Sequence, residues 1–164
     1  MPSEPARRAR LEADQAAFLE ALQGRAPTPA GFDGDDMSAA AASLLRKRLG
    51  MVVHDWPALA YAVGEDLPEA FARYAQATPP PAVGEGLADG LGFALGLDPG
   101  TLTGEARAEI LHARARFVVR SGRVAARRGP FAGAATLRHP RRVLVVMRLP
   151  GLGIGHVQLG GRGR

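Results

Sequence analysis

The chain has 164 residues, of which 46% are apolar but only 5% aromatic, so one domain, or one domain with a compact appendage, must build its core mainly from Leu, Val and Ala. It contains no cysteine, which excludes disulfides and zinc ribbons and fits the reducing cytoplasm. The N-terminus has no apolar signal segment, and no apolar run approaches the roughly 18 residues of a spanning helix. We therefore expect a cytoplasmic protein without contact to a membrane.

Charge is divided unevenly along the chain. All 16 acidic residues lie at or before Glu109, whereas 12 of the 21 basic residues follow it. Residues 1–109 thus hold 9 basic and 16 acidic side chains, for a formal charge of −7, and residues 110–164 carry +12. Such segregation indicates a nucleic acid, an acidic protein partner, or contact between the two parts of the chain.

The first half of the sequence predicts helices. Residues 4–22 form the first, with Ser3 as candidate N-cap, and a turn-rich connector follows whose Phe32 should dock on a helix. Asp35 or Asp36 can cap the next helix, which runs to about His54. Its apolar positions share one face, and the neighbouring basic residues 46–48 should point partly outward. The apolar positions are Leu45, Leu49, Val52 and Trp56.

Four further helical segments follow from Pro57, which interrupts the previous helix. A short apolar face ends at Gly64, and the spacing from Asp66 to Glu69 is that of a capping box opening a helix. Leu67, Phe71 and Tyr74 share one face of that helix. Residues 84–97 keep a leucine spacing diluted by glycines, which we expect to permit close helix approach. Thr103 can cap a last helix that runs to about Ser121.

The end of the chain changes to a period of two residues. Residues 142–149 predict a strand, residues 154–159 its antiparallel partner after a Pro-Gly turn, and residues 131–137 a weaker third strand. The fold class is therefore α+β, with an N-terminal helical domain of five or six helices followed by a small C-terminal antiparallel β-meander. The domain boundaries are residues 1–122 for the helices, 123–160 for the basic meander, and 161–164 for a disordered tail.

Residue patterns typical of catalysis or metal binding are missing from the sequence. Adjacent His54 and Asp55 point about 100° apart on a helix and suit a helix end better than an acid–base pair. The other histidines lack metal-ligand spacing, and the glycines of residues 151–155 lack the GxGxxG pattern and its following helix. We expect no enzyme activity, no cofactor and no bound metal.

The arginines of the acid-free segment form the candidate binding site. A solvated protein surface normally mixes both charges, so this segment is more typical of a functional electrostatic surface for a protein partner, a peptide or a nucleic acid. Its aromatic residues, Phe117 and Phe131, fit a core better than a stacking platform for single strands. The candidate partner-binding residues are Arg114, Arg120, Arg123, Arg127, Arg128, Arg138, Arg141 and Arg142.

The segment from Leu44 to Leu97 resembles the helical N-terminal domain of a bacterial family often described as DNA-binding. The matching residues are Trp56-Pro57, Val63-Gly64-Glu65, Phe71-Ala72-Arg73-Tyr74 and Thr78-Pro79-Pro80, followed by the glycine-rich helix. Members of that family serve as partner subunits of multinuclear non-heme iron oxidases, TIM-barrel enzymes that modify ribosomal peptides, as in methanobactin biosynthesis. The whole chain, through residues 129–133 and 148–151, also looks like a set of Streptomyces-type actinobacterial proteins.

Two functions follow from these observations. The resemblance implies a non-catalytic accessory subunit that docks on such an oxidase and helps to present its peptide substrate. The alternative is a DNA- or RNA-binding protein that uses the arginines of the C-terminal part. In either case Trp56 should lie in the helical core, where its replacement by alanine would cost roughly 3–5 kcal/mol.

Overall fold

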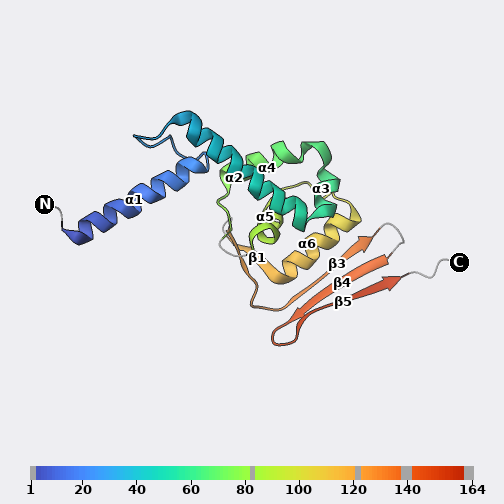
Figure 1. The fold of residues 1–164 in the computed structure, drawn as a ribbon. Coiled ribbons are helices and arrows are strands. Elements are labelled where there is room, and N and C mark those ends of the chain that lie inside the picture. Colours follow the sequence, from blue (N-terminus) through green and yellow to red (C-terminus); the bar gives the residue numbers. More distant parts are fainter. Residues whose placement is uncertain (1–2, 82–83, 121–122, 138–141, 161–164) are drawn as a thin grey trace.

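The computed structural model describes residues 3–81, 84–120, 123–137 and 142–160. Within these ranges a helical N-terminal part is followed by an antiparallel sheet (Figure 1), which confirms the predicted α+β class. The helices are α1 (Glu4–Leu22), α2 (Gly34–Asp55), α3 (Pro57–Val63), the 3-10 turn η1 (Gly64–Asp66), α4 (Leu67–Ala77), α5 (Glu85–Ala94) and α6 (Gly104–Arg116). The strands are β1 (Phe117–Arg120), β2 (Arg123–Ala126), β3 (Phe131–Leu137), β4 (Arg142–Leu149) and β5 (Gly153–Gly160).

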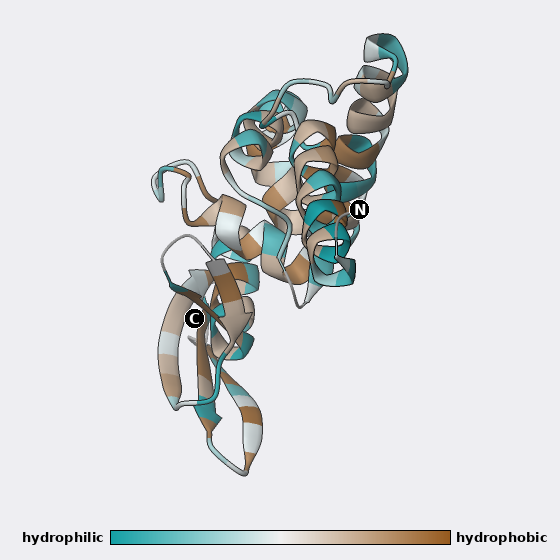
Figure 2. Cartoon of the chain, turned by 90° about the vertical axis from the view of Figure 1, so that its left-hand side faces the viewer, coloured by the Kyte–Doolittle hydropathy of each residue, from teal (hydrophilic) through white to brown (hydrophobic). Residues whose placement is uncertain are grey.

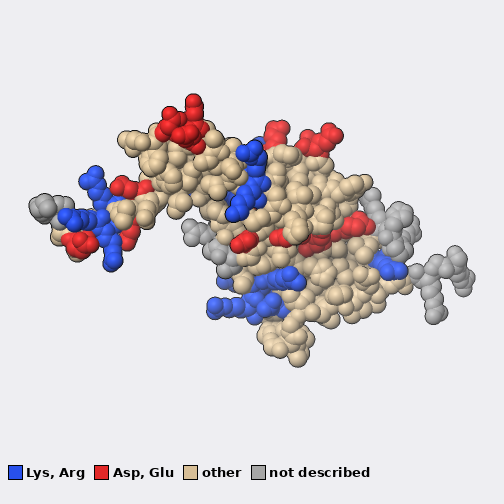
Figure 3. Space-filling model, viewed as in Figure 1, with Lys and Arg blue, Asp and Glu red and all other residues tan. Residues whose placement is uncertain are grey.

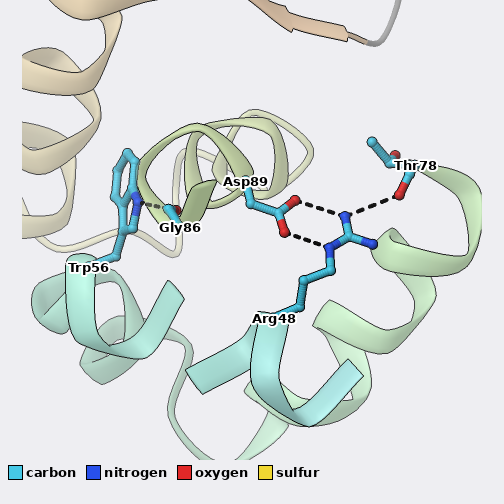
Figure 4. A network of polar contacts seen from close by, with 5 residues as sticks. All are labelled: Arg48, Trp56, Thr78, Gly86 and Asp89. Carbon is cyan, nitrogen blue, oxygen red and sulfur yellow. Dashed lines mark hydrogen bonds and ion pairs between the residues drawn. The ribbon is translucent and has the colours of Figure 1, made fainter. Parts of the chain in front are cut away.

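Trp56 is the centre of the helical core, as predicted. Its side chain is 1% exposed, and its indole Nε1 donates a hydrogen bond of 3.1 Å to the carbonyl of Gly86 on α5 (Figure 4). A methyl group at Gly90 would overlap the indole ring, so only glycine lets α5 approach this closely. Phe71 of α4 is fully buried in the same cluster. The predicted role of the α5 glycines in close helix packing is thereby confirmed.

A buried ion pair joins α2 to α5. The Arg48 guanidinium donates to both carboxylate oxygens of Asp89, at 2.6 and 2.8 Å, and to the carbonyl of Thr78 at 3.1 Å (Figure 4). Its side chain is 12% exposed and that of Asp89 is 2% exposed. The prediction that residues 46–48 point partly outward is wrong for Arg48, because the close approach of α5 places a carboxylate within its reach.

Helix α1 is poorly enclosed by the rest of the fold. It has no buried residue, and Figure 1 shows it projecting away from the other helices. Phe32 contacts the ring of Phe18 on α1, with ring centroids 4.9 Å apart, which confirms that this loop residue docks on a helix. Both Phe32 and Leu11 are nevertheless more than half exposed. The pair therefore joins the connector to α1 without creating a core.

The helix caps differ in part from those expected. The carboxylate of Asp33, and not that of Asp35 or Asp36, accepts the first amide hydrogen bonds of α2. Asp66 makes no side-chain cap, because η1 runs directly into α4 and leaves Asp66 in a helical backbone conformation. The cap at Thr103 is confirmed, since its Oγ1 accepts from the amide of Ala106 at 3.1 Å.

Helix α6 ends at Arg116, whereas the sequence predicted about Ser121. The chain continues as β1, which pairs with β2 from Phe117 opposite Ala126 to Arg120 opposite Arg123. The residues after Arg116 are Phe117-Val118-Val119, which favour strand because aromatic and β-branched side chains lose rotamer freedom in a helix. The sequence did not predict this hairpin, because the apolar residues up to Phe117 also have the spacing of a helix.

The predicted three-stranded meander is present, with the order β3-β4-β5 and antiparallel pairing throughout. One face of the sheet packs on α6 and buries Ala135, Leu144 and Val146 against Leu111 and Ala115. Gly133 lies directly beneath Leu111, where a larger side chain would overlap it. The carboxylate of Glu109 on α6 ties this unit to the helices, because it accepts from the amides of Ala58 and Leu59 at 2.9 and 2.8 Å.

Candidate functional site

The sheet face turned away from α6 is apolar and uncovered. Alternation along β4 turns Val143, Met147 and Leu149 to this side, opposite the buried Leu144 and Val146. Figure 2 shows apolar segments recurring along the strands. We call this surface the outer sheet face; the register places on it Ala132, Ala134, Thr136, Val143, Val145, Met147, Leu149, Gly153, Gly155, Val157 and Leu159.

The outer sheet face carries no charged side chain. Val143, Met147, Leu149, Val157 and Leu159 are between 38% and 59% exposed. Single exposed apolar residues are ordinary, but a contiguous apolar patch on a folded protein marks an interaction site. β5 is also an edge strand, and its burial pattern is exposed at almost every position.

A second surface lies at the end of the sheet where β3 begins and β4 ends. Arg114 at the end of α6 and Arg127 after β2 both place their guanidinium groups on the ring of Phe131, at 5.8 and 5.0 Å from its centroid. Arg148 lies opposite Phe131 in the β3–β4 register. We call Arg114, Arg120, Arg127 and Arg148 the arginine cluster.

Part of the arginine cluster caps the C-terminus of α6. Arg127 Nε donates to the carbonyl of Arg114 at 2.7 Å, and Arg148 Nη1 donates to the carbonyl of Ala115 at 3.3 Å. Cations are favourable at this negative end of a helix dipole. Burial, followed by the charges of Arg114, Arg148 and Arg120, lowers the pKa of Arg127. The capping bonds therefore hold like charges close together.

The residues before Glu109 and those after it differ in whether their charged side chains form ion pairs. Every ion pair within the described ranges joins residues that precede Glu109: Arg7–Glu4, Arg25–Glu20, Arg48–Asp89 and Arg73–Glu69. Figure 3 shows a group of basic side chains beside β1, below a row of acidic ones and with none among them. The arginine cluster thus has no carboxylate partner among the described residues.

The predicted binding residues do not form one surface. Arg114, Arg120 and Arg127 are brought together, whereas Arg142 stands at the other end of β4, about 20 Å from Arg148 at the usual strand rise. Arg123 pairs with Arg120 in the hairpin, and Arg128 is exposed in the following loop. Arg138 and Arg141 lie outside the described residues, as do residues 161–164 of the predicted tail.

Arg148 was missing from the predicted binding residues. It stands next to the predicted Pro-Gly turn in the sequence, and its inward orientation follows from alternation with Met147 and Leu149. Its place beside Arg114 depends on the crossing of α6 over the sheet, however, and no sequence pattern encodes that crossing. The contact of Phe131 with Arg114 and Arg127 could not be predicted for the same reason.

A cavity of about 430 Å³ lies between α3, α6 and the sheet, and its lining includes His112, Glu105 and Asp55. Glu109 also lines it, but both of its oxygens already cap α3. Burial, then the charges of His156 and Arg116, lowers the pKa of His112, whose ring centroid lies 5.5 Å from that of His156. No group of three or more potential metal ligands occurs within the described ranges. His139 lies outside them.

Fold and site together define a small α+β protein with two candidate binding surfaces, the outer sheet face and the arginine cluster. Among the helices of the described ranges, none combines the length and apolar character needed to cross a bilayer. Residues 12–99 match the SCO6045-like, C-terminal domain family, and the chain belongs to that family. The match covers α2 to α5 and most of α1.

One relative extends the similarity into the sheet. The chain is 37% identical over 148 residues to a UPF0276 protein of Streptomyces avermitilis, and the match covers 88% of this chain. It covers only 28% of the relative, which is therefore a much longer polypeptide. No solved structure matches the chain. The expected kinship with an actinobacterial family is thus confirmed.

Proposed function

We propose that this protein is a non-catalytic partner subunit that docks on another protein through the outer sheet face. The apolar and uncovered character of that face carries the proposal. A sheet needs a layer on each apolar face, and α6 supplies only one of them. A protein partner that covers Val143, Met147 and Val157 would remove this surface from water.

The partner that we propose is a multinuclear non-heme iron oxidase of the TIM-barrel type. The resemblance of residues 44–97 to the partner subunits of such enzymes supports this choice. The length of the Streptomyces relative supports a partner role as well, because most of that polypeptide lies beyond the stretch that matches this chain. In this role the protein helps to present a peptide to the enzyme and does not itself react with it.

Co-purification tests the proposal directly. The chain is co-expressed with a multinuclear iron oxidase encoded in the same genome, and the complex is resolved by gel filtration. Val157→Glu places a charge on the outer sheet face and should separate the two proteins into two peaks. Leu95→Glu is the matched control, because Leu95 lies on the helical part and is 49% exposed, as is Val157. Circular dichroism melting checks that both variants are folded.

Two outcomes contradict the proposal. Separate elution of the two wild-type proteins would exclude this partner. Co-elution that Val157→Glu leaves intact would exclude the outer sheet face as the contact, since a buried unpaired carboxylate is strongly unfavourable in an interface.

Nucleic-acid binding is the second candidate function, and the arginine cluster is the observation that favours it. Phosphate binding by four arginines would weaken steeply with salt. The net negative charge of residues 1–109 opposes a polyanion that extends beyond the cluster. A gel shift with duplex and single-stranded DNA at low salt tests this function, and the absence of any shift would dispose of it.

A further inference from the structure

The arginine cluster holds more hydrogen-bond donors than the fold uses. Each guanidinium group has five N–H donors, and the side-chain bonds to α6 occupy one donor of Arg127 and one of Arg148. Arg148 Nε is buried and has no hydrogen-bond partner among the described residues. That donor is enclosed, but Arg114 and Arg120 are exposed, so their donors can reach an acceptor from outside the chain.

Electrostatics also favours an anion at this position. Burial, and after it the charges of Arg114, Arg148 and Arg120, lowers the pKa of Arg127, so the neighbouring arginines repel it. No acidic residue follows Glu109 in the sequence, so the local segment cannot supply a carboxylate. Guanidinium groups bind carboxylates and phosphates through paired, charge-assisted hydrogen bonds. The site therefore suits either kind of anion by its chemistry alone.

Its shape and surroundings favour carboxylates on a peptide over a nucleic-acid backbone. The cluster is a compact group around one ring, and it does not continue along the sheet to Arg142. The Phe131 ring already has two guanidinium groups within 6 Å of its centroid, and this proximity disfavours stacking of a base on it. At the same end of the sheet, Leu152 in the turn after β4 is 82% exposed.

We propose that the arginine cluster binds an acidic peptide segment whose carboxylate side chains lie next to apolar residues. The carboxylates pair with Arg114, Arg120, Arg127 and Arg148, and the apolar residues contact Leu152 in the turn at the end of the sheet. The inference deepens the proposed function, on which it rests for the source of the segment: the peptide that the partner enzyme modifies. The chemistry of the site is a property of this chain alone.

The binding test uses the full chain without a partner. Fluorescence anisotropy follows a short labelled peptide of Glu, Leu and Ala, and an identical peptide with Gln in place of Glu is the control. We expect binding of the Glu peptide only, with an affinity that falls as salt rises. The double variant Arg114→Gln, Arg120→Gln should weaken it by about tenfold or more, as expected for lost charge-assisted bonds.

The variants are chosen to leave the fold intact. Arg114 and Arg120 make no side-chain hydrogen bond to the described residues, whereas Arg127 and Arg148 cap α6 and are left unchanged. Arg142→Gln, at the far end of β4, is the matched control and should alter the affinity by less than about twofold, because a charge about 20 Å away is screened.

Three results would overturn the inference: equal binding of the Gln peptide, no effect of the double variant, or tighter binding of DNA than of the Glu peptide. The last would assign the cluster to nucleic acid. The double variant should still co-elute with the oxidase, because the outer sheet face is unaltered. Failure of the wild-type chain to bind the Glu peptide while it still co-elutes with the oxidase would count against this inference alone. Peptide binding by the wild type without co-elution would count against the docking proposal alone.

Discussion

The helical part and the sheet differ in how completely they bury their apolar side chains and pair their charges. Around Trp56 the helices bury their apolar side chains on all sides, and Arg48 is paired with Asp89. The sheet buries one face on α6 and leaves the other exposed, and the arginine cluster at its end has no carboxylate partner among the described residues. The core around Trp56 is thus complete, although Leu11 and Phe32 at α1 remain exposed. The sheet, by contrast, leaves a contiguous apolar face exposed, which marks an interaction site.

The largest stability effect should come from the centre of the helical core. Trp56→Ala removes a ring that is 1% exposed together with its bond to Gly86, and we expect a loss of about 4 kcal/mol in the free energy of unfolding. Urea denaturation followed by circular dichroism measures it. Tyr61→Ala is the control, since Tyr61 is 84% exposed and its loss should cost less than about 0.5 kcal/mol. Equal effects would show that the core lies elsewhere.

Arg48→Ala should be nearly as damaging, because it leaves the Asp89 carboxylate buried without its partner. The expected loss is about 3 kcal/mol, reduced somewhat by the 12% exposure of Arg48. A double variant, Arg48→Met with Asp89→Leu, should regain part of that stability in the same denaturation experiment, because no charge then remains buried. An unchanged denaturation midpoint for Arg48→Ala would mean that water already reaches Asp89.

A smaller effect should come from the contact that joins the two parts. Glu109→Gln removes the charge that accepts from the amides of Ala58 and Leu59, and should cost about 1.5 kcal/mol. Glu105→Gln, one turn earlier on α6 and exposed, should cost less than about 1 kcal/mol. If both substitutions lowered the free energy of unfolding equally, the cap of α3 by Glu109 would add no measurable stability.

The smallest effect should be a pH dependence that originates between α6 and the sheet. Burial and neighbouring positive charge lower the pKa of His112 in the folded protein, so the unfolded chain takes up a proton first as the pH falls. The His112 contribution to stability is therefore present above the unfolded value, near pH 6.5, and is lost as the pH falls through the lower folded pKa.

Urea midpoints at pH 7.5 and 5.5, compared between the wild type and His112→Gln, measure this contribution. The wild type should lose more stability on acidification than the variant does. An identical loss in both proteins would place the pH dependence in other groups.

Most of the fold was predictable from the sequence because its elements are encoded locally. The β-branched run of residues 142–149 and the Pro-Gly turn predict the meander with its order, and the spacing around Trp56 predicts the helical core. The error at α6 has a local cause as well. Residues 104–121 suit a helix by their apolar spacing, but the strand preference of Phe117-Val118-Val119 prevails once β2 is available as a partner.

The candidate site was predictable only in its charge. The sequence by itself determined that every acid precedes Glu109 and that the C-terminal arginines have no acid near them in the chain. Only the tertiary structure decided which arginines meet, because α6 crosses the sheet and brings Arg114 and Arg148 to the same end of it while Arg142 lies at the other. It also decided that Arg48 is buried and that one sheet face is uncovered. These are outcomes of packing between segments distant in sequence, and local patterns do not encode them.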